Sequence, residues 1–380
     1  MKKTAAPVPR FPGLNALRFL AATAVVLSHV ELLKQYGGLP SAYERLAVYE
    51  LGRLSVTFFF VLSGYLITYL LLVEKARPEG IDVRRFYVRR VLRIWPLYYG
   101  VVLLAFLVFP AVPALRVPGH TDAVTEHVTR TLPLFLAFLP QLALSAWPPV
   151  PYAEPTWSIG VEEQFYLLWP LLLKRGRGFV LPALVVAGAT VVARHAALAT
   201  AVASRADPER LAFWNVVVNY LYFTRLECMA IGGLFAWFFW AGKTAVLKPL
   251  YSPVAQWAVY ALTAGVLVTD MFKPIFDYGP YAVLFGVVIL NVSTNPRSLV
   301  RLSGPRLEWL GNLSFSMYML HEPVVQLTIG VFRRLMRAPF ADLASNVALH
   351  AVSLLLTVGV AALAYRYFET PFLRLKSRLG

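Results

Sequence analysis

The sequence predicts an all-α fold, a polytopic helical bundle in a membrane with about ten transmembrane helices and a re-entrant segment. Of the 380 residues, 58% are hydrophobic and only 15% are charged, whereas ordinary soluble domains carry about 25% charged residues. The mean hydropathy is +0.61. No linker separates the apolar runs, so one membrane domain is predicted for residues 1–380, with a core from 12 to 373.

Nine apolar runs have roughly the length that a bilayer requires, about 17 to 25 residues. They cover residues 14–33, 54–73, 95–115, 178–203, 226–241, 254–272, 279–293, 309–332 and 343–367. Two shorter runs, 131–147 and 158–173, are ambiguous. No A-x-A cleavage site follows the first run, so we expect it to stay in the protein rather than leave as a signal peptide.

The net charge of +16 comes from 36 Lys and Arg residues against 20 Asp and Glu residues. We attribute it to topology, since cytoplasmic loops are enriched in basic residues, and we expect no nucleic-acid partner. The basic segments are the N-terminus, 75–93, 174–177, 243–248, 297–306 and the C-terminal tail.

These segments all lie on one side of the membrane only if 131–147 is a re-entrant hairpin and 158–173 crosses the membrane. The prolines between 133 and 155 favour such a break. The prediction is then ten spans with both termini cytoplasmic, to which Arg333, Arg334 and Arg337 are an exception.

Arg18 and His29 lie eleven residues apart in the first apolar run. On a helix this spacing turns both side chains to one face, with about 16 Å between them along the axis. A charged group in lipid costs from about 2.5 to more than 10 kcal/mol, so such residues face a protein interior or a watered cavity. We therefore predict a polar site inside the membrane domain, with Arg18 in the inner half of the span and His29 in the outer half.

Arginines recur between residues 85 and 96, with Arg85, Arg89 and Arg93 on one helical stripe and Arg90 beside it. Such a face can grip phosphates, or it can be a basic helix on anionic lipid, and spacing alone favours the lipid interpretation. Cys228 is the only cysteine. It excludes an intramolecular disulfide, and no metal-ligand spacing appears.

Three further patterns have both a functional and a structural interpretation. Ser63 and Gly64 lie midway in the second run, where small residues line a tunnel or, more commonly, allow close helix packing. Glu162, Tyr166 and Trp169 share one helix face, on which the carboxylate could orient an imidazole or bind a hydroxylic substrate. The structural interpretation is an acid at a helix start within an interfacial aromatic belt. A third stripe, predicted to face inward, consists of Ser314, Tyr318 and His321.

Five motifs in order give the chain a resemblance to a known family. They are the Arg18-x10-His29 pair, Phe-Phe-Phe-Val-Leu-Ser-Gly-Tyr-Leu-Ile, Phe-Tyr-Val-Arg-Arg-Val-Leu-Arg-Ile-Trp-Pro, Trp-Ser-Ile-Gly-Val-Glu-Glu-Gln-Phe-Tyr, and Leu-Gly-Asn-Leu-Ser-Phe-Ser-Met-Tyr-Met-Leu-His-Glu-Pro. With a terminal Glu-Thr-Pro, the chain resembles the acyltransferase-3 family of membrane O-acyltransferases. It departs from the family at Ile159, where leucine is usual, and at Glu227, where aspartate is expected.

The resemblance implies transfer of an acyl group, most often acetyl, from cytoplasmic acyl-CoA to a hydroxyl at the outer face. It implies that His29 is catalytic with Arg18 as its companion, that Glu162 is the acid of the fourth motif, and that Arg89, Arg90 and Arg93 contact CoA. We add Ser63 to the donor site. To the acceptor site we assign Glu163, Tyr166, Arg225 and His321.

The predicted partners are acyl-CoA as donor substrate, the lipid bilayer and a glycan, lipid-linked sugar or small-molecule acceptor, with no bound cofactor and no metal. His29 either deprotonates the acceptor hydroxyl or carries the acyl group. Some family members carry an extra periplasmic esterase-like domain, which we do not expect here. Two alternatives stay open, a transporter or flippase of lipid-linked sugars or small acids, and a sensor or scaffold with Arg18 and His29 as a structural pair.

Overall fold

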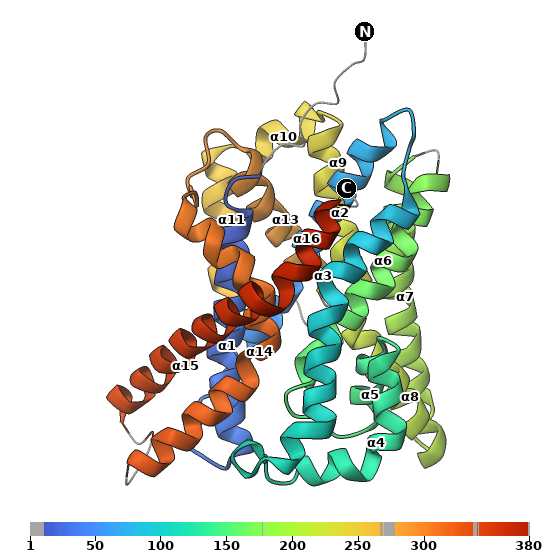
Figure 1. Cartoon of the computed structure of the whole chain (residues 1–380). Coiled ribbons are helices and arrows are strands. Elements are labelled where there is room, and N and C mark those ends of the chain that lie inside the picture. Colours follow the sequence, from blue (N-terminus) through green and yellow to red (C-terminus); the bar gives the residue numbers. More distant parts are fainter. Residues whose placement is uncertain are drawn as a thin grey trace.

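The computed structural model describes residues 11–176, 178–266, 269, 278–336, 340 and 342–378, and these contain helices and loops but no strand. The basic residues Lys2, Lys3, Arg10, Arg177 and Arg337 lie outside this part of the chain. Most helices run along one bundle, from which α14 and α15 diverge at one end (Figure 1).

The described part of the chain contains the following α-helices. They are α1 (Leu14–Tyr36), α2 (Leu46–Lys75), α3 (Val83–Leu103), α4 (Thr121–Leu136), α5 (Pro140–Ala146), α6 (Trp157–Arg175), α7 (Val180–Ala203), α8 (Pro208–Phe223), α9 (Leu226–Trp240), α10 (Thr244–Leu250), α11 (Pro253–Val266), α13 (Gly279–Thr294), α14 (Pro305–Leu335), α15 (Leu343–Ala364) and α16 (Thr370–Arg378). The short helical segments of other types are the π-helices η1 (Leu104–Val108) and η5 (Tyr365–Glu369) and the 3₁₀ helices η2 (Phe109–Ala111), η3 (Pro113–Leu115) and η4 (Glu154–Thr156).

Five described helices are long and apolar enough to cross a membrane, namely Leu14–Tyr36, Leu46–Lys75, Val83–Ala111, Val180–Ala203 and Leu343–Leu375. A sixth results if Pro208–Trp240 and α10, which meet at 108°, count as one span. The structure thus supports an all-helical membrane protein with five or six such helices, and ten spans stay a prediction. The stretch before 226, which we did not predict as a span, is helical as α8. The predicted run 254–272 extends past α11 beyond the described residues.

The predicted run 131–147 is divided between the end of α4 and α5. The chain breaks at Phe138, whose φ of 58° is unusual for a residue with a side chain. Both helices lie near the C-terminal end of α3 (Figure 1). At the other end of the bundle, the Lys75 ammonium donates to the carbonyls of Leu173 at 2.7 Å and Gly176 at 2.6 Å. Two of the basic segments, 75–93 and 174–177, therefore meet at one end.

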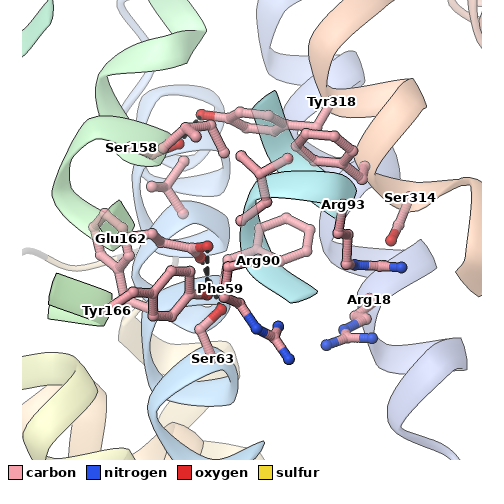
Figure 2. A pocket seen from close by; sticks show the side chains of 15 residues that line it. Arg18, Phe59, Ser63, Arg90, Arg93, Ser158, Glu162, Tyr166, Ser314 and Tyr318 are labelled. Carbon is pink, nitrogen blue, oxygen red and sulfur yellow. Dashed lines mark hydrogen bonds between the residues drawn. The ribbon is translucent and has the colours of Figure 1, made fainter. Parts of the chain in front are cut away.

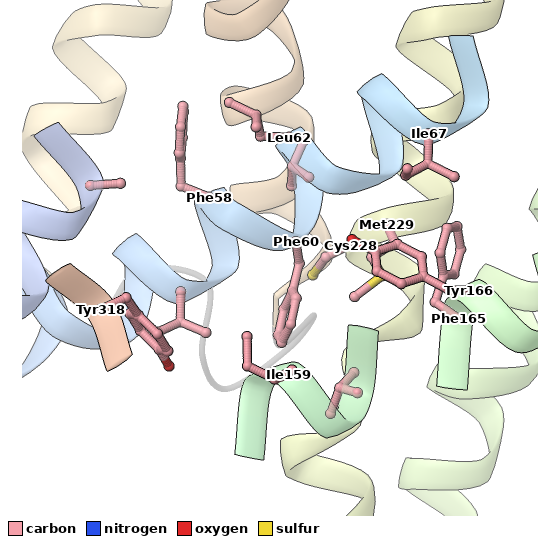
Figure 3. Packing of buried hydrophobic residues seen from close by; sticks show 14 of the residues in the cluster. Phe58, Phe60, Leu62, Ile67, Ile159, Phe165, Tyr166, Cys228, Met229 and Tyr318 are labelled. Carbon is pink, nitrogen blue, oxygen red and sulfur yellow. The ribbon is translucent and has the colours of Figure 1, made fainter. Parts of the chain in front are cut away.

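Helix α2 packs closely against α9, because glycines at two positions of the contact let the backbones approach. A Cβ on Gly64 would lie 2.0 Å from the Met229 carbonyl oxygen, and one on Gly232 would lie 2.0 Å from that of Val61. The close-packing interpretation of Gly64 is therefore correct. Figure 3 shows Phe60 directed from α2 toward α6, in the same apolar cluster as Met229.

Helices α1 and α14 form the second close pair. A Cβ on Gly311 of α14 would lie 2.2 Å from the carbonyl oxygen of Asn15 at the start of α1. Ser314, Tyr318 and His321 are buried on α14, so the prediction that this stripe faces inward is confirmed. The pairing places the stripe beside the face of α1 that carries Arg18 and His29.

Candidate functional site

A cavity of about 100 Å³ opens between α1, α2, α3, α6 and α14. Its polar lining consists of Arg18, Ser63, Arg90, Arg93, Ser158, Glu162, Tyr166, Ser314 and Tyr318. Figure 2 shows the guanidinium groups of Arg18 and Arg90 toward one end, with Ser158 and Tyr318 at the other. The cavity is thus cationic at one end and carries hydroxyl groups at the other.

The three arginines of this cavity converge without an ion-pair partner among the described residues. Arg18 comes from α1, while Arg90 and Arg93 lie one turn apart on α3, which begins after Asp82, whose carboxylate caps the helix. The Arg90 guanidinium lies 5.8 Å from the centre of the Tyr166 ring, and its Nε is buried without a hydrogen bond. Buried cations without partners are costly. The arrangement therefore favours an anionic ligand with several oxygen atoms.

Glu162 is the one carboxylate that lines the cavity. It accepts hydrogen bonds from the Ser63 hydroxyl at 2.7 Å and the Tyr166 hydroxyl at 2.8 Å, as Figure 2 shows. The two bonds fix the carboxylate near the arginines. Glu162 thereby balances part of their charge and holds Ser63 and Tyr166 in place.

His29 lies in a second polar centre, which joins α1 to α14. Its Nδ1 lies 3.0 Å from Glu322 Oε1 and 3.0 Å from His321 Nε2. Glu322 and His321 are buried, at 3% and 0% exposure, whereas the His29 side chain is 17% exposed. His29 is therefore the member of this centre that a substrate can reach.

The hydrogen bonds around His29 assign its tautomer. His321 Nδ1 lies 2.7 Å from the Tyr318 carbonyl oxygen, which can only accept, so this nitrogen carries the proton and His321 Nε2 is an acceptor when the ring is neutral. Glu322 and His321 then both present acceptors to His29 Nδ1, which must carry a proton. The other nitrogen of His29, Nε2, keeps its lone pair and is free to act as a base or a nucleophile.

Tyr318 connects the two polar centres. Its side chain lines the cavity and its hydroxyl donates to the Pro155 carbonyl at 2.8 Å, while Ser158 Oγ lies 2.8 Å away. Its own carbonyl holds His321. A ligand that extends from the arginines along the cavity therefore ends at the residue that supports the His29 centre.

A half-buried carboxyl, Glu154 of η4, lies in the loop before α6 and faces the end of α1. Its Oε2 is 3.4 Å from the Tyr36 hydroxyl at the end of α1. Removal from water and the negative charge of Glu322 raise the pKa of Glu154 to about 7, although His29 and the Tyr36 hydroxyl act in the opposite direction.

The structure brings together some of the residues predicted for the site and separates others. Arg18, Ser63, Arg90, Arg93, Glu162 and Tyr166 line the cavity, and His321 meets His29. Arg89 lies outside the lining, 3.7 Å from Glu74, because the helix turns Arg90 and Arg93 toward the cavity and Arg89 away from it.

Of the four residues assigned to an acceptor site, Tyr166 lies with the arginines and His321 lies at His29. Glu163 accepts from Trp95 Nε1 at 3.3 Å and is not in the lining. Arg225 is buried, donates to Thr57 at 2.9 Å and to Tyr278 at 2.8 Å, and lies over the Tyr278 ring. The structure does not gather these four residues at one place.

Sequence reasoning did not assign Glu322, Glu154 or Tyr36 to the site. Glu322 follows His321 directly in the chain, and its acidity next to a histidine was the available signal. Glu154 and Tyr36 carried none, since only tertiary packing brings the loop before α6 to the end of α1.

Among the described residues, His29, His321 and Glu322 form the group that could hold a metal ion, with ligand atoms within 4.8 Å of one another. Two imidazoles and a carboxylate are a known zinc ligand set. The same atoms hydrogen-bond to one another here, which is the arrangement that proton transfer needs.

Comparison with known proteins adds a family to this geometry. A family model described as an acyltransferase domain matches residues 11–366. The chain is 27% identical to the O-acetyltransferase OatA of Staphylococcus aureus over 96% of its own length and 57% of that protein.

Two further relatives have similar names. The chain is 27% identical to the putative peptidoglycan O-acetyltransferase YrhL of Bacillus subtilis, covering 95% of this chain and 54% of that one. It is 26% identical to the peptidoglycan O-acetyltransferase OatA of Listeria monocytogenes, over 95% and 55% of the two chains. The chain thus spans about half the length of the curated relatives it matches. No solved structure matches it.

Proposed function

Since this chain belongs to the acyltransferase domain family whose model matches residues 11–366, we propose that it is a membrane O-acetyltransferase. We propose acetyl-CoA as donor and a peptidoglycan sugar hydroxyl as acceptor. The acceptor follows from the names of the relatives in Bacillus and Listeria. The donor follows from the chemistry of the cavity.

The observation that carries the proposal is the cavity that runs from three arginines without an ion-pair partner among the described residues to Tyr318. The Tyr318 carbonyl holds His321, which in turn contacts His29. The phosphates of CoA would bind Arg18, Arg90 and Arg93 through charge-assisted hydrogen bonds. The pantetheine arm would extend past Ser63 and Glu162 toward Tyr318. The thioester would then reach the free Nε2 of His29.

In the proposed reaction His29 Nε2 takes the proton of the acceptor hydroxyl as its oxygen attacks the thioester carbonyl. The carbon–sulfur bond breaks, the ester forms, and the proton passes to the leaving CoA thiolate. Glu322 orients His29 through Nδ1 and stabilises the imidazolium that forms during transfer. His321 supports the same nitrogen from its anchor on Tyr318.

The proposed orientation follows the basic loops. The segments 75–93 and 174–177 would face the cytoplasm, which places the arginines toward the donor and His29 toward an outer acceptor. Both termini are then cytoplasmic, and because the relatives are bacterial proteins the proposed location is the bacterial inner membrane. CoA then needs to enter from one side only, while the acetyl group leaves on the other.

The test is acetyl transfer by the purified protein from radiolabelled acetyl-CoA to a peptidoglycan fragment. We expect His29→Ala to reduce the rate of acetyl transfer by at least about 100-fold, because a general base contributes that much to the rate. The matched control is His195→Ala, because His195 is exposed on α7 and its Nδ1 bonds only the Val191 carbonyl of its own helix.

An active His29→Ala variant would exclude His29 as the base. A wild-type protein that binds acetyl-CoA but never forms CoA would exclude an acetyltransferase. Transport of an intact sugar without CoA release would instead support the flippase alternative.

A further inference from the structure

The proposed mechanism leaves the half-buried carboxyl of Glu154 without a role. Glu154 directly precedes Pro155, whose carbonyl accepts the hydrogen bond of Tyr318. Its partner Tyr36 is also half-buried, and so is His120, whose ring stacks on that of Tyr36 with centres 4.3 Å apart and an angle of 29° between the planes. We call these three residues the Glu154 cluster. It joins the end of α1, the loop before α4 and the turn before α6.

The backbone holds Glu154 in a defined position. Its amide donates to the Val150 carbonyl at 2.9 Å. The next carbonyl, that of Pro155, accepts from Tyr318 at 2.8 Å and from the Ser158 hydroxyl at 3.2 Å. Glu154 is therefore fixed next to the residue at which the cavity ends.

The side chain of Glu154 keeps capacity for a ligand. Its contact with the Tyr36 hydroxyl, at 3.4 Å, is longer than the 2.5–3.0 Å of a normal O–H···O hydrogen bond. Its other oxygen, Oε1, has no hydrogen-bond partner among the described residues, and an ionised carboxylate has about four acceptor positions. Glu322 already occupies His29 Nδ1, so the mechanism does not need Glu154 for that purpose.

The chemistry of the cluster fits a sugar. Hydroxyl groups donate to a carboxylate, and the apolar faces of a pyranose ring pack on flat aromatic surfaces such as the stacked Tyr36 and His120 rings. A lipid tail or a small acid would gain nothing from Glu154, since the carboxylate repels an anion and is costly to bury against a hydrocarbon.

We propose that the Glu154 cluster is the acceptor subsite, in which Glu154 accepts a hydrogen bond from a saccharide hydroxyl and the Tyr36–His120 stack supports the sugar ring. The inference rests on the proposed function and assigns residues of this chain to the binding of its sugar acceptor. Glu154 is a binding residue in this scheme, while His29 performs the proton transfer.

The experiment measures steady-state kinetics with acetyl-CoA and a purified disaccharide fragment of peptidoglycan, alongside hydrolysis of acetyl-CoA by water. Glu154→Gln is expected to raise the acceptor KM about tenfold or more, because hydrogen bonds to a charged group contribute that much to affinity. The KM for acetyl-CoA and the hydrolysis rate should stay within about threefold, since the donor cavity and His29 are unchanged.

Three further variants complete the design. Glu126→Gln, at an exposed position on α4, is the matched control and should behave as the wild type. Tyr36→Phe keeps the ring and should have little effect, whereas Tyr36→Ala should raise the acceptor KM. Each variant is first compared with the wild type by its unfolding temperature, so that a loss of fold is recognised.

An unchanged acceptor KM in folded Glu154→Gln and Tyr36→Ala would overturn the subsite. Equal loss of transfer and hydrolysis in folded Glu154→Gln would also overturn it, because that result describes a residue of the catalytic centre. A wild type that neither transfers nor hydrolyses would contradict the proposed function itself, and the two failures are thus distinct.

Discussion

At the residue scale, the hydrogen bonds of one nitrogen organise the candidate centre. His29 Nδ1 faces Glu322 and His321, which are 293 and 292 residues away in the sequence. Both partners come from α14, and both are buried. Because they occupy Nδ1, Nε2 is the nitrogen of His29 that remains for the proposed proton transfer, and the same two residues keep the ring in one orientation.

Glu154 gives a prediction about pH and stability. Its pKa is raised to about 7 in the folded protein from an ordinary value of 4.5, through removal from water and the charge of Glu322, against His29 and Tyr36. Its stabilising contribution is therefore complete below about pH 4.5 and is lost as the pH rises through 7, where the folded state must give up the proton.

The amide side chain of Glu154→Gln stays neutral, so this variant does not lose this stabilising contribution as the pH rises. Between pH 5 and pH 8, we expect the unfolding temperature of the wild type to decrease by about 2 °C or more relative to that of Glu154→Gln. Thermal unfolding in detergent at intervals of one pH unit measures the difference. Parallel curves for the two proteins would contradict the raised pKa.

At the element scale, the rotation of α3 decides which arginines belong to the cavity. Arg90 and Arg93 line it, whereas Arg89 lies near Glu74 at 3.7 Å. The residues are neighbours in the sequence and have the same charge. Their different surroundings make them a matched pair for mutation.

Arg93→Ala is expected to raise the KM for acetyl-CoA by about 10-fold or more, since it removes a charge-assisted contact to a phosphate. Arg89→Ala should change that KM by less than about threefold, because a partly exposed ion pair contributes little. Equal effects of the two variants on CoA binding would show that the charge of α3 as a whole, and not the cavity, attracts the donor.

The contact between α2 and α9 gives a second prediction at this scale. A Cβ at Gly64 would lie 2.0 Å from the Met229 carbonyl oxygen, so Gly64→Ala must push the helices apart. We expect a loss of about 1–3 kcal/mol or more in the free energy of unfolding. Gly188→Ala on α7 is the control, because a Cβ there meets no atom within 4 Å. A Gly64→Ala protein as stable as the control would contradict this packing.

At the scale of the whole molecule, charge and polar chemistry divide along the bundle. The basic segments around Lys75 and Lys174 meet at one end, and the three cavity arginines come from the same membrane domain. His29 and the Glu154 cluster lie farther along α1. A donor that is charged and an acceptor that is a sugar would therefore approach from opposite ends.

Labelling of single cysteines tests this arrangement, since Cys228 is the only native cysteine and is buried. In a Cys228→Ser background, Pro40→Cys in the exposed loop after α1 should react with an impermeant maleimide in intact cells. Glu79→Cys, in the exposed loop after α2, should react only after the membrane is opened. The reverse pattern would invert the proposed orientation.

The sequence by itself determined the features that depend on local periodicity. The helical fold, most of the long apolar helices, and the inward stripe of Ser314, Tyr318 and His321 follow from composition and from spacing along one helix. Arg18 and His29 share one continuous helix, as their spacing required.

Only the tertiary structure decided how these faces meet. Periodicity sets the angle between two side chains of a helix but not the direction in which the helix is turned, so it could not distinguish Arg89 from Arg90 or separate Arg225 from the cavity. The pairing of His29 with Glu322 and the approach of Glu154 to Tyr36 depend on contacts between distant segments. Packing of α1 against α14, made close by Gly311, is the physical reason that His29 and Glu322 form one centre.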